Sequence, residues 1–262
     1  MKVVLFCGGL GMRLREYSEN TPKPMVPIGH RPIVWNLMKY YAHYDNKEFI
    51  LCLGHNASVI KDYFLNYDEC LTNDFVLEQG AAKLLKTDID DWKITFADTG
   101  LKSNIGMRLQ AVEKYLGDLG PEDMFMANYA DGLSDVPLDD MLEFFEKSGK
   151  TACFVCVKPA QSFHYVRLDD EGTVEGIQDM TNTGLTVNGG FFIFKKKIFD
   201  YIKEGEELVH EPFERLIAEN ELVAYQYDGF WKCMDTFKDK QTFDEMYAEG
   251  SCPWHVWQDG KK

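Results

Sequence analysis

The stretch Leu5-Phe6-Cys7-Gly8-Gly9-Leu10-Gly11-Met12-Arg13-Leu14 follows an apolar run at the start of the chain. Residues 2–6 have the composition and length of a buried β-strand that ends where the glycines begin. Glycine has no Cβ to block a ligand, and successive free N–H groups in such a turn form a concave anion site. The stretch therefore predicts a strand followed by a glycine turn able to bind an anion.

Two cations close to this turn are suited to phosphate. Arg13 carries a fixed fork of donors, and Lys23 is a mobile point charge in the stiff segment Thr21-Pro22-Lys23-Pro24-Met25. The glycines match neither the dinucleotide fingerprint nor the P-loop, so alone they indicate only an ordinary strand-to-helix turn. Together with the two cations, they favour a phosphate site.

Composition limits the class of protein. The chain has 262 residues, 45% of them hydrophobic, and a formal charge of −15 from 28 basic and 43 acidic residues. This is enough for a large core, and we expect a single domain over residues 1–262. The acidic balance argues against non-specific binding to nucleic acid or to an acidic membrane. With no apolar run of about eighteen residues and no signal-peptide pattern, we expect a cytoplasmic protein.

The cysteines do not form a recognisable framework. Their number is odd, seven, and they are spread along the chain, which argues against a set of disulfides. Cys153 and Cys156 have the spacing of a metal or redox pair, but they lie in an apolar run typical of a buried strand. We expect buried, unreactive thiols.

Strand and helix patterns alternate through the first half of the chain. Helices are expected over 32–45, 58–66 and 105–116, and strands over 49–53, 92–97 and 123–128. This alternation implies parallel strands with right-handed crossovers. In such sheets ligands bind at the carboxyl ends of the strands, where the glycine turn and Gly54 would lie.

The second half is richer in strand patterns. Strands are expected over 151–157, 165–168, 174–177, 186–194 and 222–225, and helices over 138–147 and 213–218. Residues 241–257 are expected to form a helix followed by an aromatic tail that docks on the protein. This density predicts a smaller β region beside the parallel sheet. Asn188-Gly189-Gly190 interrupts one strand, which indicates close approach of a ligand or of another backbone.

Two further positions could carry chemistry. Asp131 follows the strand over 123–128, and a carboxylate at such a strand end is a common position for Mg²⁺. An ordinary Asp-Gly turn has the same sequence, so the residues alone leave both readings open. Arg108 lies near the start of an expected helix, and the residues alone favour an exposed surface position.

The motifs together resemble a known family. Gly-Gly-Leu-Gly-x-Arg-Leu from Gly8 and Thr-Pro-Lys-Pro-Met-Val-Pro-Ile-Gly from Thr21 are similar to motifs of the sugar-1-phosphate nucleotidylyltransferases. The likeness continues in order through Ala130-Asp131-Gly132, Asn188-Gly189-Gly190 and Gly229-Phe230-Trp231-Lys232-Cys233-Met234-Asp235-Thr236. Within that family the chain most resembles the glucose-1-phosphate cytidylyltransferases.

The resemblance implies a fold and a division of labour. It implies an α/β, Rossmann-like nucleotidyltransferase fold with a mostly parallel central sheet and an additional smaller β region. The nucleotide-binding half would span about 1–135, and the acceptor-binding half with the C-terminal tail about 136–262. It also implies that the chain forms a homo-oligomer.

The resemblance also implies roles for individual residues. The catalytic residues would be Arg13 and Lys23. The nucleotide, CTP or another nucleoside triphosphate, would contact Leu5, Cys7, Gly8, Gly9, Gly11, Met12, Arg13, Lys23, Gly54 and Asp131. The phosphorylated small-molecule acceptor would contact Arg108, Asn188, Gly189 and Asp179. The cofactor Mg²⁺ would be held by Asp131 and Asp235.

The implied reaction needs no general base. A phosphate monoester is largely a dianion at pH 7, because its second pKa is ~6. Its oxygen can therefore attack the α-phosphorus directly, and pyrophosphate leaves. Catalysis would consist of positioning and charge stabilisation.

The chain departs from the family pattern on the acceptor side. Met180 stands where the family has a lysine that grips the sugar phosphate, and Ser162-Phe163-His164-Tyr165 stands where the cytidylyltransferases have Arg-Phe-Gly. These changes predict weaker use of glucose-1-phosphate and leave open another sugar phosphate, or a non-sugar phosphate or phosphonate. A non-catalytic nucleotide-binding regulator is a further alternative, although retention of the cations and carboxylates argues against it.

Overall fold

The computed structural model describes residues 1–9, 21–159, 164–180 and 183–258. Its centre is an eight-stranded sheet with the order β13-β10-β14-β8-β1-β4-β7, in which β15 also pairs with β10. These strands are β1 (Lys2–Phe6), β4 (Glu48–Leu53), β7 (Lys93–Asp98), β8 (Met124–Tyr129), β10 (Ala152–Val157), β13 (Val187–Asn188), β14 (Phe192–Lys195) and β15 (Leu222–Tyr227).

The strands from the first half of the chain are parallel. β1 pairs in parallel with both β4 and β8, and β4 pairs in parallel with β7. The expected parallel arrangement is therefore confirmed, and the carboxyl ends of these strands meet at one edge. β14 then runs antiparallel to β8 and β10, so the sheet becomes mixed in the second half.

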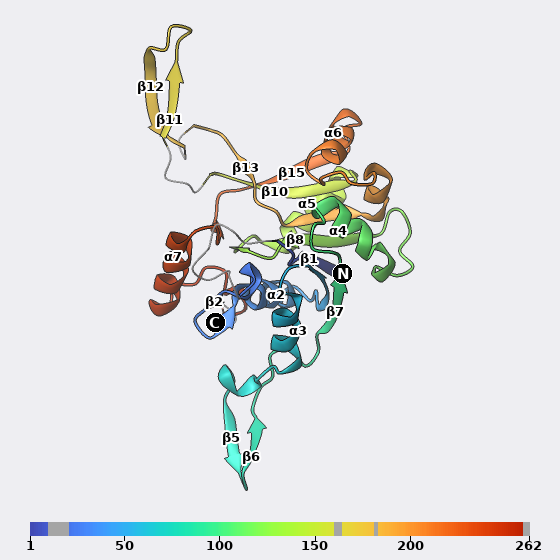
Figure 1. Ribbon diagram of the computed structural model, residues 1–262, viewed down its shortest axis with the longest axis vertical. Helices are drawn as coiled ribbons and strands as arrows, with labels where there is room; N and C mark the ends of the chain where they lie inside the picture. The colour runs from blue at the N-terminus through green and yellow to red at the C-terminus, as the bar shows by residue number, and fades with distance from the viewer. Residues whose placement is uncertain (10–20, 160–163, 181–182, 259–262) are drawn as a thin grey trace.

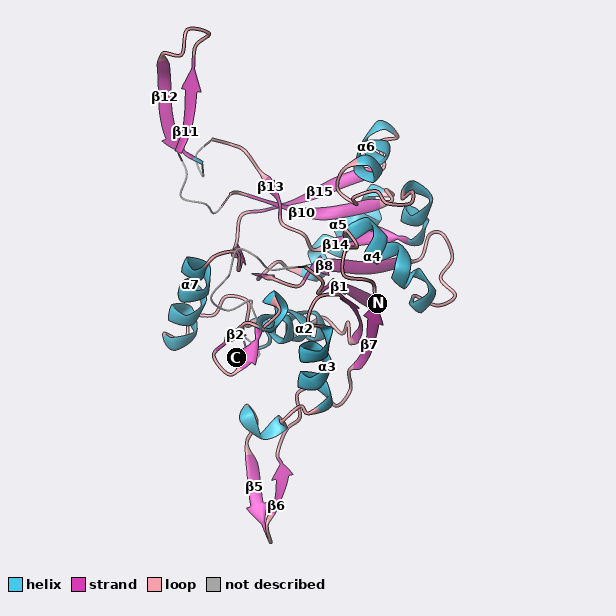
Figure 2. Cartoon of the chain, viewed as in Figure 1, coloured by secondary structure: helices cyan, strands magenta, loops and turns pink. Residues whose placement is uncertain are grey.

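Helices cover both faces of this sheet (Figure 2). They are α2 (Ile33–His43), α3 (Ala57–Leu65), α4 (Ile105–Val112), α5 (Leu138–Ser148), α6 (Glu211–Ala218) and α7 (Phe237–Ala248). Alternate residues of β1 point to opposite sides. Val3 and Leu5 pack into a core with α2, α5 and α7, whereas Val4 and Phe6 pack into a second core with α4 and α6. The result is a three-layer α/β/α structure.

The strand over 186–194 is interrupted at its glycines, as expected. β13 and β14 both pair with β10. Between them the Gly189 N–H donates to the Val155 carbonyl at 2.8 Å, and the Val155 N–H donates to the Gly190 carbonyl at 2.9 Å. The chain therefore bulges there while keeping its ladder to β10.

Two hairpins stand away from the body at opposite ends of the molecule (Figure 1). One is formed by β5 (Phe75–Glu78) and β6 (Ala81–Leu84), and the other by β11 (His164–Leu168) and β12 (Val174–Asp179). The second hairpin contains the strands expected over 165–168 and 174–177 and forms a smaller β region outside the central sheet. Nearly all side chains of both hairpins are exposed.

Short elements complete the fold. Two small ribbons pair β2 (Pro27–Ile28) with β3 (Arg31–Pro32), and β9 (Gly132–Ser134) with β16 (Trp231–Cys233). The 3₁₀ turns are η2 (Lys23–Met25), η3 (Glu69–Leu71), η4 (Glu113–Tyr115), η6 (Lys196–Tyr201) and η7 (Val256–Gln258). Neither β9–β16 nor β2–β3 has a sequence pattern that predicts it.

Several boundaries differ from expectation. The helix expected over 105–116 ends at Val112 and continues as the η4 turn. The helix expected within 241–257 is α7, which begins earlier than expected, at Phe237, and ends at Ala248. The tail after α7 is docked, because Trp254 has no exposed surface. All seven cysteines are free. Cys153 is buried as predicted, whereas Cys156 is only half-buried. Among the described helices, none has the length and apolar character needed to cross a bilayer.

Candidate active site

A small cavity lies where β1 and β8 end. It has a volume of about 80 Å³ and is lined by Phe6, Cys7, Gly8, Gly9, Lys23, Pro24, Ala130 and Asp131. The cavity brings the glycine turn together with Lys23 and Asp131, which are far apart in the sequence. These are residues that the sequence assigns to nucleotide binding.

Lys23 is fixed at the start of the short η2 turn. Pro22 precedes it in an extended conformation, and the Met25 N–H donates to the Pro22 carbonyl at 2.7 Å. The Lys23 Nζ donates to Asp131 Oδ2 and to Asp235 Oδ1, each at 2.5 Å. Burial alone would lower the pKa of Lys23, but the two carboxylates outweigh it and raise that pKa. The ammonium therefore stays charged at neutral pH.

The β9–β16 ribbon explains why the two carboxylates converge. Gly132 pairs with Cys233 in this ribbon, and the Met234 N–H donates to the Asp131 carbonyl at 2.8 Å. Asp131 and Asp235 flank these paired residues in the sequence. A ribbon made from segments about one hundred residues apart thus sets both carboxylates around one ammonium.

The two carboxylates are a suitable donor set for Mg²⁺. They already converge on a single positive charge, the Lys23 ammonium, and carboxylate oxygens are ligands that Mg²⁺ prefers. The described residues contain no group of three or more His, Cys, Asp or Glu side chains able to hold a metal. The remaining ligands would have to be phosphate oxygens and water, which is how Mg²⁺ usually binds.

Cys233 adds a neutral donor to this cluster. Its Sγ donates to Asp235 Oδ2 at 3.3 Å. Burial, and then the neighbouring Asp235 carboxylate, raises the pKa of the Cys233 thiol to about 12. The thiol therefore remains protonated at pH 7 and holds one oxygen of Asp235.

Arg108 lies behind the glycine turn and not on the surface, so the surface position favoured by the residues alone was wrong. It is 1% exposed, and its Nη1 donates to the Leu53 carbonyl at 3.1 Å and to Thr99 Oγ1 at 2.6 Å. No carboxylate of the described residues forms an ion pair with it. Burial lowers the pKa of Arg108. A guanidinium stays charged even so, and this one lies buried beneath the anion site.

Gly8 and Gly54 make room for this arginine. A Cβ on Gly8 would overlap the Arg108 guanidinium, and one on Gly54 would come within 3.0 Å of it. A Cβ on Gly9 would meet no atom of the described residues within 4 Å, so no described side chain occupies the space in front of Gly9. The turn therefore has one glycine that packs on the protein and one free to approach a ligand.

The Asn188-Gly189 segment is held by residues beside the carboxylates. Asn188 Oδ1 accepts from the Gly190 N–H at 2.8 Å, and the Gly189 carbonyl accepts from Trp231 Nε1 at 2.7 Å. Gly190 has φ +75°, and a Cβ there would overlap Asn128 Oδ1. Close approach of protein atoms accounts for the glycine pair, while the exposed Asn188 remains accessible to an acceptor.

Other residues assigned from the sequence lie elsewhere. The side chain of Leu5 has no exposed surface, and only its carbonyl, which accepts from the Cys7 N–H, faces the turn. Asp179 lies on the protruding β12 with an exposed side chain that pairs with His164 at 3.3 Å. The structure therefore does not bring Asp179 together with Lys23. Gly11, Met12 and Arg13 lie outside the described residues, as do Ser162 and Phe163.

Some site residues could not be identified from the sequence. Asn128 Oδ1 accepts from the Phe191 N–H at 2.9 Å and fixes the glycine bulge. Thr99 orients Arg108, and Cys233 holds Asp235. Each acts through one contact that depends on how the chain folds.

Comparison with known proteins agrees with this geometry. A family model described as nucleotidyl transferase matches residues 2–259. The chain is 34% identical over 260 residues to a probable glucose-1-phosphate cytidylyltransferase of Bacillus subtilis, covering 98% of this chain and 100% of that protein. It is also 34% identical over 261 residues to glucose-1-phosphate cytidylyltransferase of Salmonella typhi, with the same coverage.

The fold is shared with more distant proteins. A solved structure of UDP-glucose pyrophosphorylase complexed with UDP-glucose superposes with a TM-score of 0.68 at 14% identity, covering 95% of this chain and 98% of that one. That likeness concerns the fold alone. With the match of the family model along almost its whole length, the chain belongs to the nucleotidyl transferase family.

Proposed function

We propose that the protein transfers CMP from CTP to glucose-1-phosphate and releases pyrophosphate. The observation that carries this proposal is the convergence of Lys23, Asp131 and Asp235 at the cavity of the glycine turn. The 34% identity to glucose-1-phosphate cytidylyltransferases along the chain supports CTP and glucose-1-phosphate as the substrates.

The residues present are suited to an in-line displacement. An oxygen of the acceptor phosphate forms a new bond to the α-phosphorus of CTP. The bond to the β-phosphate oxygen breaks, and its electron pair leaves with pyrophosphate. The charged Lys23 Nζ donates to the α-phosphate as negative charge develops there, and Gly9 lets the backbone N–H groups reach the triphosphate.

Mg²⁺ held by Asp131 and Asp235 would supply charge neutralisation between the nucleotide and the acceptor phosphate. The protein's own part is to aim both carboxylates at one point. The β9–β16 ribbon does this for Asp131, and the Cys233 thiol does it for Asp235. Arg108, which the family resemblance assigns to the acceptor, is 1% exposed beneath Gly8 and would add positive charge there and not a direct contact.

A second acceptor remains a candidate because of Met180. A thioether cannot replace the charge-assisted hydrogen bond of a lysine, which contributes roughly 1.5–3 kcal/mol. Met180 follows β12 at the base of the protruding hairpin, and its carbonyl accepts from the Thr183 N–H at 3.2 Å. Another sugar phosphate, or a phosphonate, would be favoured if no other group replaces that contact.

Further properties follow from this proposal. Residues of about 1–135 would bind the nucleotide and about 136–262 the acceptor, within one domain. Apolar side chains on both hairpins support a homo-oligomer. The use of CTP is consistent with a cytoplasmic enzyme.

The proposal is tested by measuring pyrophosphate release from CTP, UTP, GTP and ATP, each with and without glucose-1-phosphate. We expect release with CTP only when the acceptor is present. Nucleotide binding without pyrophosphate release from any pair of substrates would instead support the non-catalytic regulator.

Asp131→Asn and Asp235→Asn should each raise the Mg²⁺ concentration needed for activity without lowering Tm. Full activity of both variants at low Mg²⁺ would exclude the assigned metal site.

A further inference from the structure

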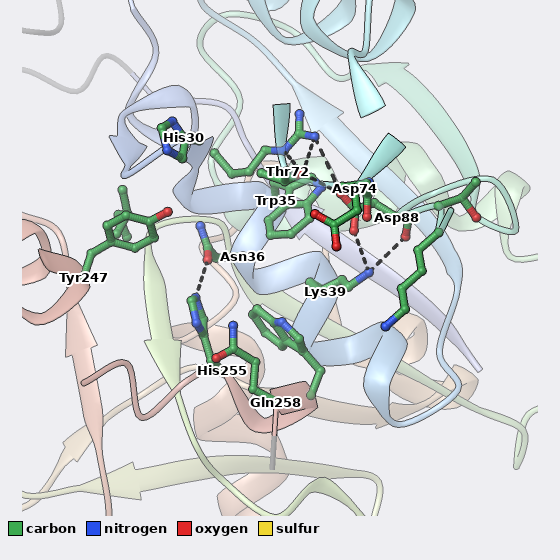
Figure 3. Close-up of a pocket in the computed structure, with 16 residues that line it drawn as sticks. His30, Trp35, Asn36, Lys39, Thr72, Asp74, Asp88, Tyr247, His255 and Gln258 are labelled. Atoms are coloured by element: carbon green, nitrogen blue, oxygen red, sulfur yellow. Dashed lines mark hydrogen bonds and ion pairs between the residues drawn. The ribbon is translucent and has the colours of Figure 1, made fainter. Parts of the chain in front are cut away.

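A second and larger cavity lies apart from the glycine turn. It has a volume of about 780 Å³ and shares no lining residue with the small cavity. Three separate segments form it: the start of α2 with the β2–β3 turn, the base of the β5–β6 hairpin, and the end of the chain after α7. Figure 3 shows its side chains directed towards a common space, among them Trp35, Asn36, Tyr247 and His255. Its size is that of a small-molecule site.

The cavity offers aromatic surface. Trp35 and Trp257 meet edge to face with their ring centroids 6.2 Å apart, and His255 lies 4.6 Å from Trp257. Trp35 is fixed, because its Nε1 donates to the Tyr67 hydroxyl at 2.9 Å. Rigid aromatic rings on a cavity wall provide a stacking surface for a planar ligand.

The charges of the cavity are only partly used within the protein. Arg31 and Lys39 both pair with Asp88, at 3.6 and 3.2 Å. Lys86 and Asp74 also line the cavity, yet neither side chain makes a hydrogen bond or ion pair with any described residue. Lys86 is therefore available to a phosphate, and Asp74 can accept from hydroxyl groups. Arg31, Lys39 and Lys86 give the cavity three cations against the two carboxylates of Asp74 and Asp88. The cavity is therefore net positive, although the chain as a whole is strongly acidic.

A neutral polar edge faces the same space. Asn36 is 3% exposed, and its Nδ2 donates to the Pro32 carbonyl at 3.2 Å, which orients its Oδ1 towards His255 Nε2 at 3.3 Å. The proton of His255 therefore lies on Nε2. Burial lowers the pKa of His255 to about 4, so the ring is neutral at pH 7 and its Nδ1 is an acceptor beside Gln258. Asn36 Oδ1 also accepts from Trp254 Nε1 at 3.2 Å, so Asn36 is used within the protein. The exposed Gln258 is the group of this edge that can bond a nucleobase.

We propose that this cavity is a second nucleotide site that binds a nucleoside monophosphate. The base stacks on Trp257, whose ring meets the buried Trp35 edge to face. The ribose hydroxyls face Asp74, and the phosphate pairs with Lys86. The cavity thus has an aromatic ring for the base, a carboxylate for the ribose hydroxyls and a cation for the phosphate of one ligand. A neutral sugar would leave Lys86 unused, and an inorganic anion would leave the aromatic wall unused.

Two segments connect this cavity with the candidate active site. One runs from Lys23 to the β2–β3 turn, and the other runs from Asp235 along α7 to Tyr247. They meet at the active site through the Lys23–Asp235 ion pair. They meet again at the cavity, where Gly29, at φ +60°, packs against the Tyr247 ring. A ligand that shifts the contact between Gly29 and Tyr247 will therefore change the Lys23–Asp235 ion pair. This coupling rests on the proposed function, whereas the binding of the nucleotide does not.

The binding is tested by calorimetric titration of the full-length protein with CMP, UMP, AMP and GMP. Lys86→Ala and Trp257→Ala remove the phosphate partner and part of the aromatic wall. Lys83→Ala is the matched control, since Lys83 is an exposed lysine of β6 that does not line the cavity. At least one nucleotide should show a binding event that is kept in the control and weakened roughly tenfold to a hundredfold in Lys86→Ala.

The alternatives give distinct results. Lys86 is exposed, so its replacement should not impair folding. If Lys86→Ala weakens the binding of none of the four nucleotides, the proposal is wrong. If a second copy of the chain covers the cavity, no such event will be seen, which also overturns it. The coupling predicts that the nucleotide changes the KM for CTP differently in wild type and in Lys86→Ala. Identical responses would contradict the coupling.

Discussion

At the level of single residues, the account depends most on Lys23. Lys23→Ala should lower kcat by a factor on the order of 10²–10³, because a positioned donor to a developing charge is lost. The same substitution should change nucleotide affinity much less. Asp131 and Asp235 would then lose the Lys23 ammonium as their shared hydrogen-bond donor. Pyrophosphate release and a nucleotide titration measure the two effects. Lys23→Arg should restore only part of the rate, since a planar fork places its donors differently. Unchanged turnover in Lys23→Ala would remove the proposed role.

The two glycines of the turn should behave differently when substituted. Gly8→Ala places a Cβ into the Arg108 guanidinium, and such overpacking costs about 1–3 kcal/mol, so both Tm and activity should fall. Gly9→Ala meets no atom of residues 1–9, 21–159, 164–180 and 183–258 within 4 Å and is the matched control for stability. Thermal denaturation should leave Gly9→Ala unchanged, while its KM for CTP rises if the nucleotide approaches there. Equal losses of Tm in both variants would show that Gly8 has no special contact.

At the level of secondary structure, the N-terminus of α7 positions Asp235. Thr236 Oγ1 accepts from the Asp239 N–H at 3.2 Å, and Asp239 Oδ2 accepts from the N–H groups of Thr236 and Asp235, at 2.9 and 3.2 Å. Thr236→Ala should lower the free energy of unfolding by about 1 kcal/mol. It should also raise the Mg²⁺ concentration needed for activity, because Asp235 follows the cap.

Thr242→Ala provides the control in the same helix. Its hydroxyl donates to the Lys238 carbonyl at 2.9 Å and takes no part in the cap. Chemical denaturation should show a change within about 0.5 kcal/mol for this variant. If both substitutions have the same effect on stability and on Mg²⁺ dependence, the cap does not position Asp235.

The sequence predicted most elements but not the contacts between them. Apolar runs such as those of β1 and β4 and amphipathic patterns such as that of α5 depend on local composition, and they appear nearly where expected. β9 and β16 are three residues each and pair across about one hundred positions, so no periodicity could reveal them. This ribbon is what sets Asp131 and Asp235 around Lys23. The sequence could therefore identify the site residues while the ion pairs among them depend on tertiary structure.

The burial of Arg108 illustrates the same limit. A lone arginine near a helix start normally lies on the surface, and only the convergence of β1, β4 and α4 encloses it. Its partners, the Leu53 carbonyl and Thr99, belong to other segments. The sequence indicated that a ligand approaches Gly8 and Gly54. The structure adds a second reason for glycine at both positions, because the Arg108 guanidinium lies where a Cβ would point.

At the level of the whole molecule, the hairpins predict association. Val166 and Ile177 are paired across β11–β12 and are 43% and 63% exposed. Exposed apolar surface on a strand pair is typical of a protein interface. Light scattering should give a mass that is a multiple of 30.2 kDa, and Val166→Lys with Ile177→Lys should reduce it. Glu171→Lys, in the turn of the same hairpin, should not. A monomeric wild type, or an assembly unaffected by the double substitution, would contradict this.

The most direct test of the account is the rate of CDP-glucose formation from CTP and glucose-1-phosphate. We expect CTP-dependent product in the presence of Mg²⁺, with kcat/KM for glucose-1-phosphate above that of galactose-1-phosphate and mannose-1-phosphate at saturating CTP. The product should disappear almost completely in Lys23→Ala. Absence of CDP-glucose with wild-type protein, together with efficient turnover of a different phosphorylated acceptor, would contradict the proposed reaction.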